Sequence, residues 1–212
     1  MKQVNLFTDF VAESQNTQLA LKLLPHCKQL VRRCGYNIEY ENGLTTYDQS
    51  EIEHFSKWHP IFKEFEEWIY TQVEDYKIMA GFTTGYGPNF KKSNPLTPKI
   101  KAMWVSEQFE NGFHETHAHI GTKDHISGTF YVNAPEGSSA ILFKRLDYDY
   151  DSWHNLPKSK NYQEFNSSKY EFWPYVGQNL MWKSSMPHGV KVNKSDSRIA
   201  ISYNIELQNN ED

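Results

Sequence analysis

The second half of the chain consists of short apolar segments separated by turns, and this pattern restricts the fold more than any other feature. Between residues 99 and 207, runs of Val, Ile, Phe, Tyr and Trp alternate with turn-forming residues, as strands and their connections do. The eight segments are 99–109, 112–119, 126–134, 139–145, 170–176, 179–184, 188–193 and 198–207. Eight strands at this spacing are typical of a jelly-roll barrel, so the sequence predicts a mainly β fold.

The first half of the chain has helical patterns instead. Residues 14–33 contain good helix formers, with Pro25 as a break between two short helices and Gly35 as a stop. A longer helix is expected to begin at Pro60 and to end before Gly81. Its apolar residues recur every three or four positions: Phe62, Phe65, Ile69, Val73, Tyr76 and either Met79 or Ala80. We expect this helix to pack on one face of the sheet.

The length of the chain suits a single domain. With 212 residues, it can bury a core without disulfides or a structural metal. We expect one domain over residues 1–212, with helices and a connecting loop in 1–98 and the barrel in 99–207. Residues 82–98 are rich in Gly, Pro, Asn and Ser, and residues 146–169 are polar with several aromatics. Both are expected to lie on the surface and to shape the mouth of a pocket.

Charge and cysteine content narrow the class of partner. The chain has 26 acidic and 22 basic residues, a formal net charge of -4, and no long run of either sign. The absence of a basic stripe disfavours nucleic acid, and the absence of a long apolar run disfavours a membrane. Cys27 and Cys34 lack the spacing of a disulfide framework, so a cytoplasmic location is expected. A small-molecule or peptidyl substrate fits better, and a homodimer stays open.

Histidines are concentrated in one predicted strand. Four of the nine lie between positions 114 and 125. Because side chains alternate along a strand, Glu115, His117 and His119 should project to one face, and His114 and Thr116 to the other. Two histidines at this spacing reach one metal ion in an extended geometry, and a distant residue has to complete the ligand set.

His188 is the candidate for the distant ligand. It lies in a later predicted strand, where Gly189 would leave room beside the metal. Non-haem iron oxygenases usually combine two histidines with one carboxylate. Three histidines, or two histidines with Asp124 or Glu115, are therefore both open as ligand sets. A His-x-His pattern also occurs without metal, and His125 is expected to be exposed.

The strand predicted at 198–207 has two different faces. The apolar face, expected in the core, consists of Ile199, Ile201, Tyr203, Ile205 and Leu207. The other face consists of Arg198, Ala200, Ser202 and Asn204, a small and polar row suited to a cavity. A guanidinium inside a barrel needs an anion and binds carboxylates in a bidentate manner. Arg198 is thus suited to hold a dicarboxylic cosubstrate, the alternative being a surface salt bridge.

Two stretches taken together resemble a known family. They are HAHIGTKDHISGTFYVNAP at 117–135 and MWKSSMPHGVKVNKSDSRIAISYNI at 181–205. They resemble the 2-oxoglutarate- and iron(II)-dependent oxygenases of marine bacteria and cyanophages, which have a His-x-His, a Ser-Gly strand, a proline turn, and a later histidine and arginine. The resemblance covers roughly residues 100–207. The loop between His119 and Ser127 is slightly longer than in that family.

The resemblance implies a prolyl-hydroxylase-like, cupin-like double-stranded β-helix. It implies Fe(II) held by His117, His119 and His188, and 2-oxoglutarate bound through Arg198. Residues expected to line the cosubstrate or substrate pocket are Ser202, Asn204 and Tyr131, with Trp182 as a wall. The expected reaction uses O2, converts 2-oxoglutarate to succinate and hydroxylates an unknown substrate, in the host cytoplasm if the chain is phage-encoded.

Two other functions stay open at this point. The first is a cupin-like metalloenzyme, a three-histidine dioxygenase that does not use 2-oxoglutarate and for which Arg198 would be incidental. The second is a non-catalytic jelly-roll module with a binding or structural role. Fold alone does not decide among these functions.

Overall fold

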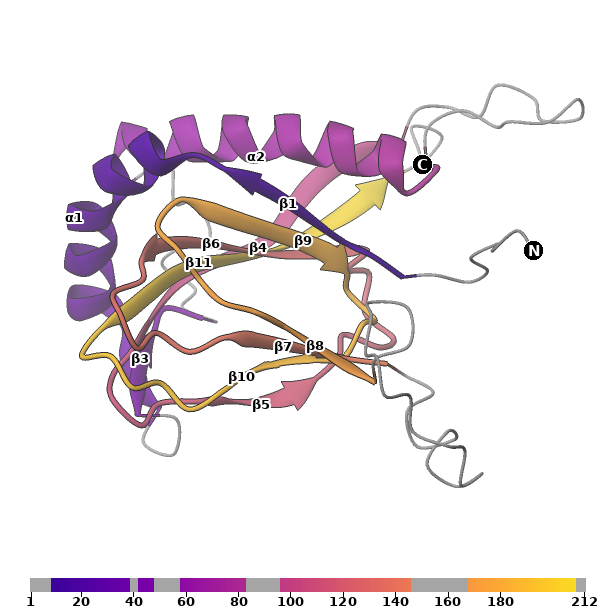
Figure 1. The fold of residues 1–212 in the computed structure, drawn as a ribbon. Helices are drawn as coiled ribbons and strands as arrows, with labels where there is room; N and C mark the ends of the chain where they lie inside the picture. The colour runs from indigo at the N-terminus through magenta and orange to yellow at the C-terminus, as the bar shows by residue number, and fades with distance from the viewer. Residues whose placement is uncertain (1–8, 39–41, 48–57, 83–95, 146–167, 209–212) are drawn as a thin grey trace, which may run out of the picture.

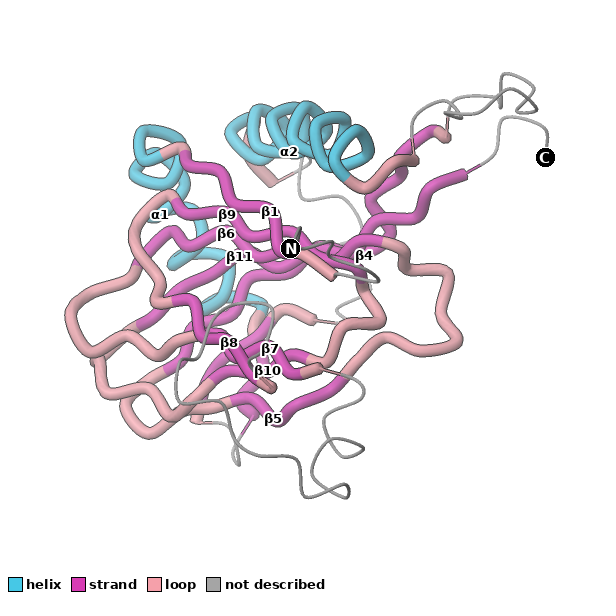
Figure 2. Tube along the Cα trace, turned by 45° about the vertical axis from the view of Figure 1, so that its right-hand side comes forward, coloured by secondary structure: helices cyan, strands magenta, loops and turns pink. Residues whose placement is uncertain are grey.

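Two antiparallel β-sheets face each other, and two helices cover the outer face of the larger sheet (Figure 1). The computed structural model describes residues 9–38, 42–47, 58–82, 96–145 and 168–208. A second view shows the sheets as two layers (Figure 2). This is the jelly-roll arrangement that the sequence predicted.

The larger sheet has seven strands, and its neighbouring strands are all antiparallel. In spatial order they are β1 (Val11–Gln15), β9 (Gln178–Lys183), β6 (Ile126–Asn133), β11 (Arg198–Gln208), β4 (Thr97–Gln108), β3 (Gly43–Thr45) and β2 (Tyr36–Ile38). β11 pairs with β4 along its whole length and with β6 on its other side. The centre of this sheet is therefore long and regular.

The smaller sheet has four short strands. In spatial order they are β5 (His114–His117), β10 (His188–Val190), β7 (Ile141–Lys144) and β8 (Lys169–Phe172). Each of the eight segments predicted as strands between residues 99 and 207 overlaps one strand of β4 to β11. The predicted loop 82–98 and insertion 146–169 fall mostly outside the described residues.

Three strands come from the N-terminal part, where the sequence predicted only helices. β1 pairs with β9, β3 pairs with β4, and β2 pairs with β3, so these strands form both edges of the larger sheet. Segments of three to five residues are too short to show a periodic pattern. Their strand conformation depends on hydrogen bonds to partners that are distant in sequence.

α1 spans Thr17–Cys34 as one helix, so the predicted division at Pro25 was wrong. Asn16 caps its start, and Gly35 follows its end as predicted. A proline inside a helix cannot donate to the carbonyl four residues earlier, which here belongs to Leu21. Both residues are exposed, so water can reach that carbonyl and the helix continues.

α2 spans Pro60–Met79 and confirms the prediction for this segment. Its predicted apolar face is buried against the larger sheet, whereas Met79 is 58% exposed and Ala80 packs at the edge of the core. The helix buries Phe62, Phe65, Ile69, Val73 and Tyr76. α2 therefore covers the sheet as expected.

The main hydrophobic core lies between the helices and the larger sheet. The predicted apolar face of β11 enters it, with Ile199, Ile201, Tyr203, Ile205 and Leu207. A smaller cluster lies between the two sheets and consists of Tyr131, Ile141, Phe143, Leu180, Trp182, Met186 and Ala200. The side chains on the opposite face of β11 point between the two sheets and line a cavity there.

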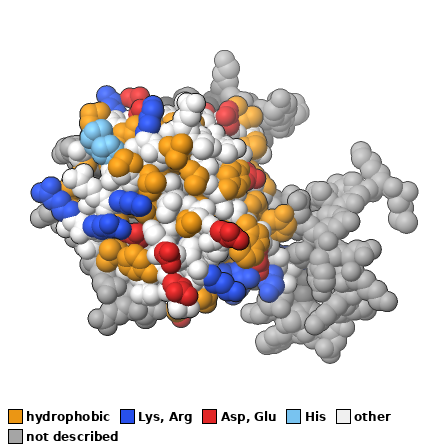
Figure 3. Space-filling model, turned by 60° about the vertical axis from the view of Figure 1, so that its left-hand side comes forward, with side chains coloured by type: hydrophobic (Ala, Val, Ile, Leu, Met, Phe, Trp, Pro, Cys, Tyr) orange, Lys and Arg blue, Asp and Glu red, His pale blue; other side chains and the backbone are white. Residues whose placement is uncertain are grey.

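The surface on the α1 side carries both basic and acidic side chains, interspersed with apolar ones (Figure 3). This face has no large patch of a single charge. Neither of the described helices combines the length and the apolar character needed to cross a bilayer.

Candidate active site

A bulge in β5 decides which side chains of this strand face the cavity. His117 lies opposite His188, and His114 lies opposite Val190, so β5 advances by three residues where β10 advances by two. An extra residue of this kind is a β-bulge, and it shifts the alternation of side chains. His114 and His117 consequently line the same cavity. The prediction that they point to opposite faces was wrong.

Gly189 makes the bulge possible. A Cβ at this position would lie 3.0 Å from the carbonyl oxygen of His114 and 3.0 Å from the backbone nitrogen of Thr116. A side chain at this position would be crowded by the backbone of β5, so glycine suits the close approach of the two strands. The space beside Gly189, which the sequence suggested for a metal, is taken by the backbone of β5.

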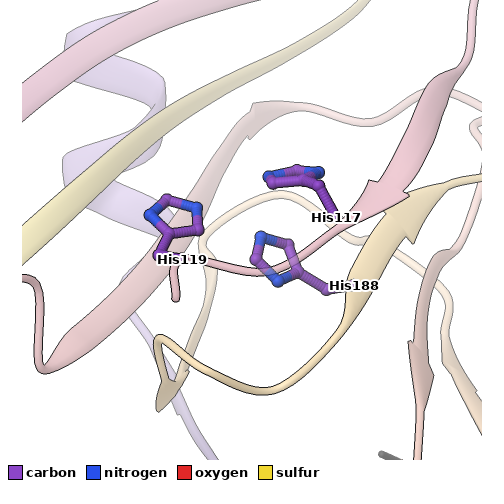
Figure 4. A group of neighbouring side chains, drawn as sticks. All are labelled: His117, His119 and His188. Carbon is purple, nitrogen blue, oxygen red and sulfur yellow. The ribbon is translucent and has the colours of Figure 1, made fainter. Parts of the chain in front are cut away.

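Three imidazoles converge at one end of the cavity. The ligand nitrogens of His117, His119 and His188 all lie within 4.8 Å of one another, and their rings turn toward a common point (Figure 4). His119 lies just beyond β5, where its backbone N–H donates to the carbonyl of Ser184 at 3.0 Å. A metal bound at about 2.1 Å from each nitrogen needs them about 3 Å apart. Small side-chain rotations would close the set.

The hydrogen bonds of two of these rings leave Nε2 as the ligand atom. Nδ1 of His117 lies 3.0 Å from the carbonyl oxygen of Glu115, and Nδ1 of His188 lies 2.9 Å from that of Met186. A carbonyl oxygen only accepts, so each Nδ1 carries the proton and Nε2 the lone pair. The indole nitrogen of Trp182, 3.3 Å from Nδ1 of His188, is then a packing neighbour and not a donor.

His119 has a charged partner instead. Its Nδ1 lies 3.4 Å from a carboxylate oxygen of Asp124 and 3.2 Å from the amide nitrogen of Asn204. With a metal on Nε2, Nδ1 carries the proton and donates to the carboxylate. This protonation state requires the side-chain amide of Asn204 to be rotated by 180°. Its oxygen would then accept from His119, and its nitrogen would donate to the Ser127 hydroxyl, which lies 2.8 Å from the amide atom assigned as Oδ1.

Burial keeps two of the imidazoles neutral. Burial is the main cause that lowers the pKa of His188 to about 3; the Met186 carbonyl opposes the shift, and the neighbouring histidines add to it. Burial also lowers the pKa of His117. Because only the neutral ring has a lone pair for a metal, both side chains are in the binding form at neutral pH.

The two carboxylates considered as alternative ligands lie outside the histidine cluster. Glu115 is exposed because the bulge turns it away from the cavity. Asp124 lies on the Nδ1 side of His119. His125 is exposed, as predicted, and its Nδ1 accepts the backbone N–H of Leu207 at 3.0 Å. Among the described residues, three nitrogens are therefore the candidate ligand set.

The same cavity, of about 460 Å³, contains Arg198 in its lining. Arg198 is 4% exposed, its Nη1 donates to Oε1 of Gln108 at 2.8 Å, and its guanidinium lies 4.8 Å from the ring centre of Tyr131. Its Nε has no partner, and no carboxylate of the described residues pairs with it. A buried cation with a free donor is suited to a carboxylate ligand.

The other predicted pocket residues lie around these groups. Ser202, Asn204 and Trp182 line the cavity, with Ala200 on the same face of β11. Tyr131 is fully buried and packs against the guanidinium without reaching the cavity surface, and its hydroxyl has no partner. The structure thus brings all but Tyr131 to the cavity itself.

Several cavity residues were missed in the sequence, among them Gln108, Trp104 and Tyr47. Gln108 lies opposite Arg198 in the β4–β11 pair, and Trp104 lies opposite Ser202. Tyr47 stacks edge-on against Trp104, with ring centres 4.9 Å apart. Alternation along 99–109 could have placed Gln108 and Trp104 on one face, but only strand pairing reveals that they face the same cavity as Arg198.

A sequence comparison finds a matching family. Residues 102–204, from β4 to β11, match the family described as "Putative 2OG-Fe(II) oxygenase". The matched stretch contains all three histidines and Arg198. The match points to a 2-oxoglutarate/Fe(II)-dependent oxygenase. The resemblance seen in the sequence is confirmed, and the non-catalytic module and the dioxygenase without 2-oxoglutarate are set aside. The expected marine or phage origin stays a prediction.

Solved structures with the double-stranded β-helix share the fold of this oxygenase. A prolyl-4-hydroxylase from Pseudomonas putida superimposes with a TM-score of 0.60 at 10% identity, covering 95% of this chain and 94% of that chain. A Trichoplax adhaerens prolyl hydroxylase, in complex with a hypoxia inducible factor peptide fragment, gives 0.60 at 13%, covering 93% and 83%. HygX from Streptomyces hygroscopicus, with nickel and 2-oxoglutarate bound, gives 0.57 at 6%, covering 93% and 83%. No curated protein matches the chain.

The residues of this oxygenase fit the cofactors of its family, Fe(II) and 2-oxoglutarate. Three imidazoles whose Nε2 atoms are free suit a divalent iron and leave coordination positions open. The unpaired donor of Arg198 suits the far carboxylate of a dicarboxylic acid. Both sets of groups line one cavity.

Proposed function

We propose that this oxygenase hydroxylates a C–H bond of a small-molecule or peptidyl substrate, with His117, His119 and His188 as iron ligands and Arg198 as the anchor of 2-oxoglutarate. The observation that carries the proposal is a single cavity lined by both the three imidazoles and the buried guanidinium. When bound, iron and 2-oxoglutarate supply the oxidising power, since O2 delivers one oxygen atom to the substrate and one to succinate, with release of CO2.

The cosubstrate end of the cavity is prepared before binding. Gln108 fixes one side of the Arg198 guanidinium and Tyr131 supports its face, so the guanidinium is held in place in the cavity lining. Arg198 would pair with the far carboxylate, while Ser202 and Asn204 offer short polar side chains along the same face of β11. Little reorganisation is then needed when 2-oxoglutarate binds.

The substrate end is assigned to the β3–β4 side of the cavity. Trp104 and Tyr47 form an aromatic pair in the lining, and Tyr47 is 48% exposed, so the cavity reaches the surface here. An aromatic wall holds an apolar part of a ligand and keeps water away from the reacting atom. Prolyl hydroxylases act on peptides, so peptides belong in any first set of test substrates. The homodimer and the cytoplasmic location stay predictions.

Anaerobic reconstitution tests the proposal. Purified protein with Fe(II) and 2-oxoglutarate should develop the visible charge-transfer absorption of the chelated cosubstrate. Admission of O2 should then release succinate slowly, and a true substrate should accelerate the release and gain an oxygen atom, measured by mass spectrometry. A protein that shows neither the absorption nor any Fe(II)-dependent succinate would refute the proposed function.

A further inference from the structure

The candidate ligand set of this oxygenase is electrically neutral. Among the described residues, three imidazoles and no carboxylate are placed to hold the metal. In the usual facial triad, one carboxylate neutralises part of the iron charge. A negative charge that partly neutralises the iron would therefore have to come from a residue outside the ligand set.

Asp124 brings a carboxylate to the rear of this one histidine. Its Oδ2 lies 3.4 Å from Nδ1 of His119, and the two side chains are only 17% and 16% exposed. The corresponding nitrogens of His117 and His188 face neutral backbone carbonyls, at 3.0 Å and 2.9 Å. His119 is therefore the one member of the cluster with an anionic partner among the described residues.

The position of Asp124 is set by the chain on both sides of it. The next residue, His125, donates its backbone N–H to Ile205 of β11 at 2.8 Å and accepts from the backbone N–H of Ser184 at 3.1 Å. His119 is itself bonded to Ser184 through its backbone. The carboxylate and the imidazole are thus tied to the same neighbouring segment, which holds them face to face.

A carboxylate behind a ligating histidine has known physical consequences. It fixes the tautomer and the orientation of the ring and makes Nε2 a stronger donor to the metal. In a partly buried pair the attraction is weakly screened by solvent, so the effect reaches the metal. We propose that Asp124 is a positioning residue that supplies, through His119, the negative charge that a carboxylate ligand supplies in the usual facial triad. The inference rests on the proposed function, in which His119 binds the iron.

Three variants test Asp124 without relying on turnover. Asp124→Asn removes the charge and keeps the size and an accepting oxygen, and Asp124→Glu keeps the charge. Glu115→Gln removes a charge from an exposed side chain of the same segment and leaves in place the backbone carbonyl that His117 contacts. Anaerobic titration with Co(II), followed by visible absorption, should give an affinity about 10–100-fold weaker for Asp124→Asn. Asp124→Glu should recover most of the loss, and Glu115→Gln should behave as the wild type.

A spectroscopic readout separates an effect on the metal from an effect on folding. The charge-transfer band of the Fe(II)–2-oxoglutarate complex should move to higher energy in Asp124→Asn, because a weaker donor leaves the iron less electron-rich. Equal Co(II) affinity and an unmoved band in Asp124→Asn would overturn the inference. An equal loss in Glu115→Gln would also overturn it, because general surface charge would then suffice.

A second background tests whether Asp124 acts through His119. In His119→Asp a carboxylate is placed directly in the ligand set, so adding Asp124→Asn should no longer weaken Co(II) binding. If it weakens binding as much as in the wild type, Asp124 does not act through His119 and the inference fails. If the wild type itself binds neither Co(II) nor Fe(II), the proposed function fails first, and the two failures are distinguishable.

Discussion

β11 and β5 line the same cavity from opposite sheets, but the alternation of side chains predicted from the sequence holds in β11 and fails in β5. β11 pairs on both sides over a long stretch, and its alternation places Arg198, Ser202 and Asn204 in the cavity as the pattern predicts. β5 has four residues and a bulge, and its alternation fails at Glu115. The proposed cosubstrate wall is thus set by a regular strand, and the proposed metal wall by an irregular one whose geometry depends on a neighbour.

The difference suggests that the two walls can be disabled separately. The metal wall depends on three side chains that meet across β5 and β10. The cosubstrate wall depends on one guanidinium held by β4 and β6. Variants on either wall therefore test whether the metal and 2-oxoglutarate sites are independent.

The largest effect is expected from His188→Ala on the metal wall. Loss of a residue that supports a metal ligand typically lowers metal affinity by roughly 10–100-fold, and loss of the ligand itself should lower it further. Co(II) binding should therefore be lost at any practical concentration. Anaerobic Co(II) titration measures this. The metal-free variant should keep the far-ultraviolet circular dichroism of the wild type, and retention of tight Co(II) binding would exclude His188 as a ligand.

Arg198→Ala should produce the next largest effect, on the opposite wall. Losing one partner of a buried, hydrogen-bonded ion pair costs about 2–5 kcal/mol, which weakens 2-oxoglutarate binding by roughly 30-fold or more. Arg198→Lys should recover only part of this, because lysine lacks the bidentate fork. Calorimetry with 2-oxoglutarate measures the loss, while Co(II) affinity should stay at the wild-type value. A parallel loss of Co(II) affinity would mean that the two walls are not independent.

Gly189→Ala tests the bulge that distinguishes β5 from β11. The new Cβ would press on the backbone of His114 and Thr116, and such overpacking costs about 1–3 kcal/mol of the free energy of unfolding. Thermal unfolding should shift to lower temperature, and Co(II) affinity should fall with it because His117 moves. The exposed Thr116→Ala is the matched control, expected within about 0.5 kcal/mol of the wild type. An unchanged Gly189→Ala would show that the bulge does not need a glycine.

Trp104→Leu should have the smallest effect on the two binding sites, because the side chain lies on the β3–β4 side of the cavity. Co(II) and 2-oxoglutarate affinities should stay unchanged, while substrate-stimulated succinate release should fall as the aromatic wall is lost. Tyr47→Phe, which keeps the ring, serves as the control. A drop in 2-oxoglutarate affinity instead would assign Trp104 to the cosubstrate wall.

Much of the barrel could be predicted from residue patterns. The strands from β4 to β11 were expected because apolar, β-branched and aromatic runs between turns mark them locally. β1, β2 and β3 were not, because strands this short form only against a partner. The break expected at Pro25 did not occur, because Leu21 and Pro25 lie on the exposed side of the helix. The sequence alone does not reveal which side of a helix is exposed.

The candidate site divides in the same way. The sequence by itself determined which residues are candidates to hold iron and a dicarboxylic acid, because imidazole and guanidinium chemistry belongs to the side chains. Only the tertiary structure decided that His114 faces the cavity, that Glu115 faces solvent, and that Asp124 lies behind His119. The physical reason is that a bulge and a loop contact depend on the strand packed alongside, and a single chain segment does not encode its partner.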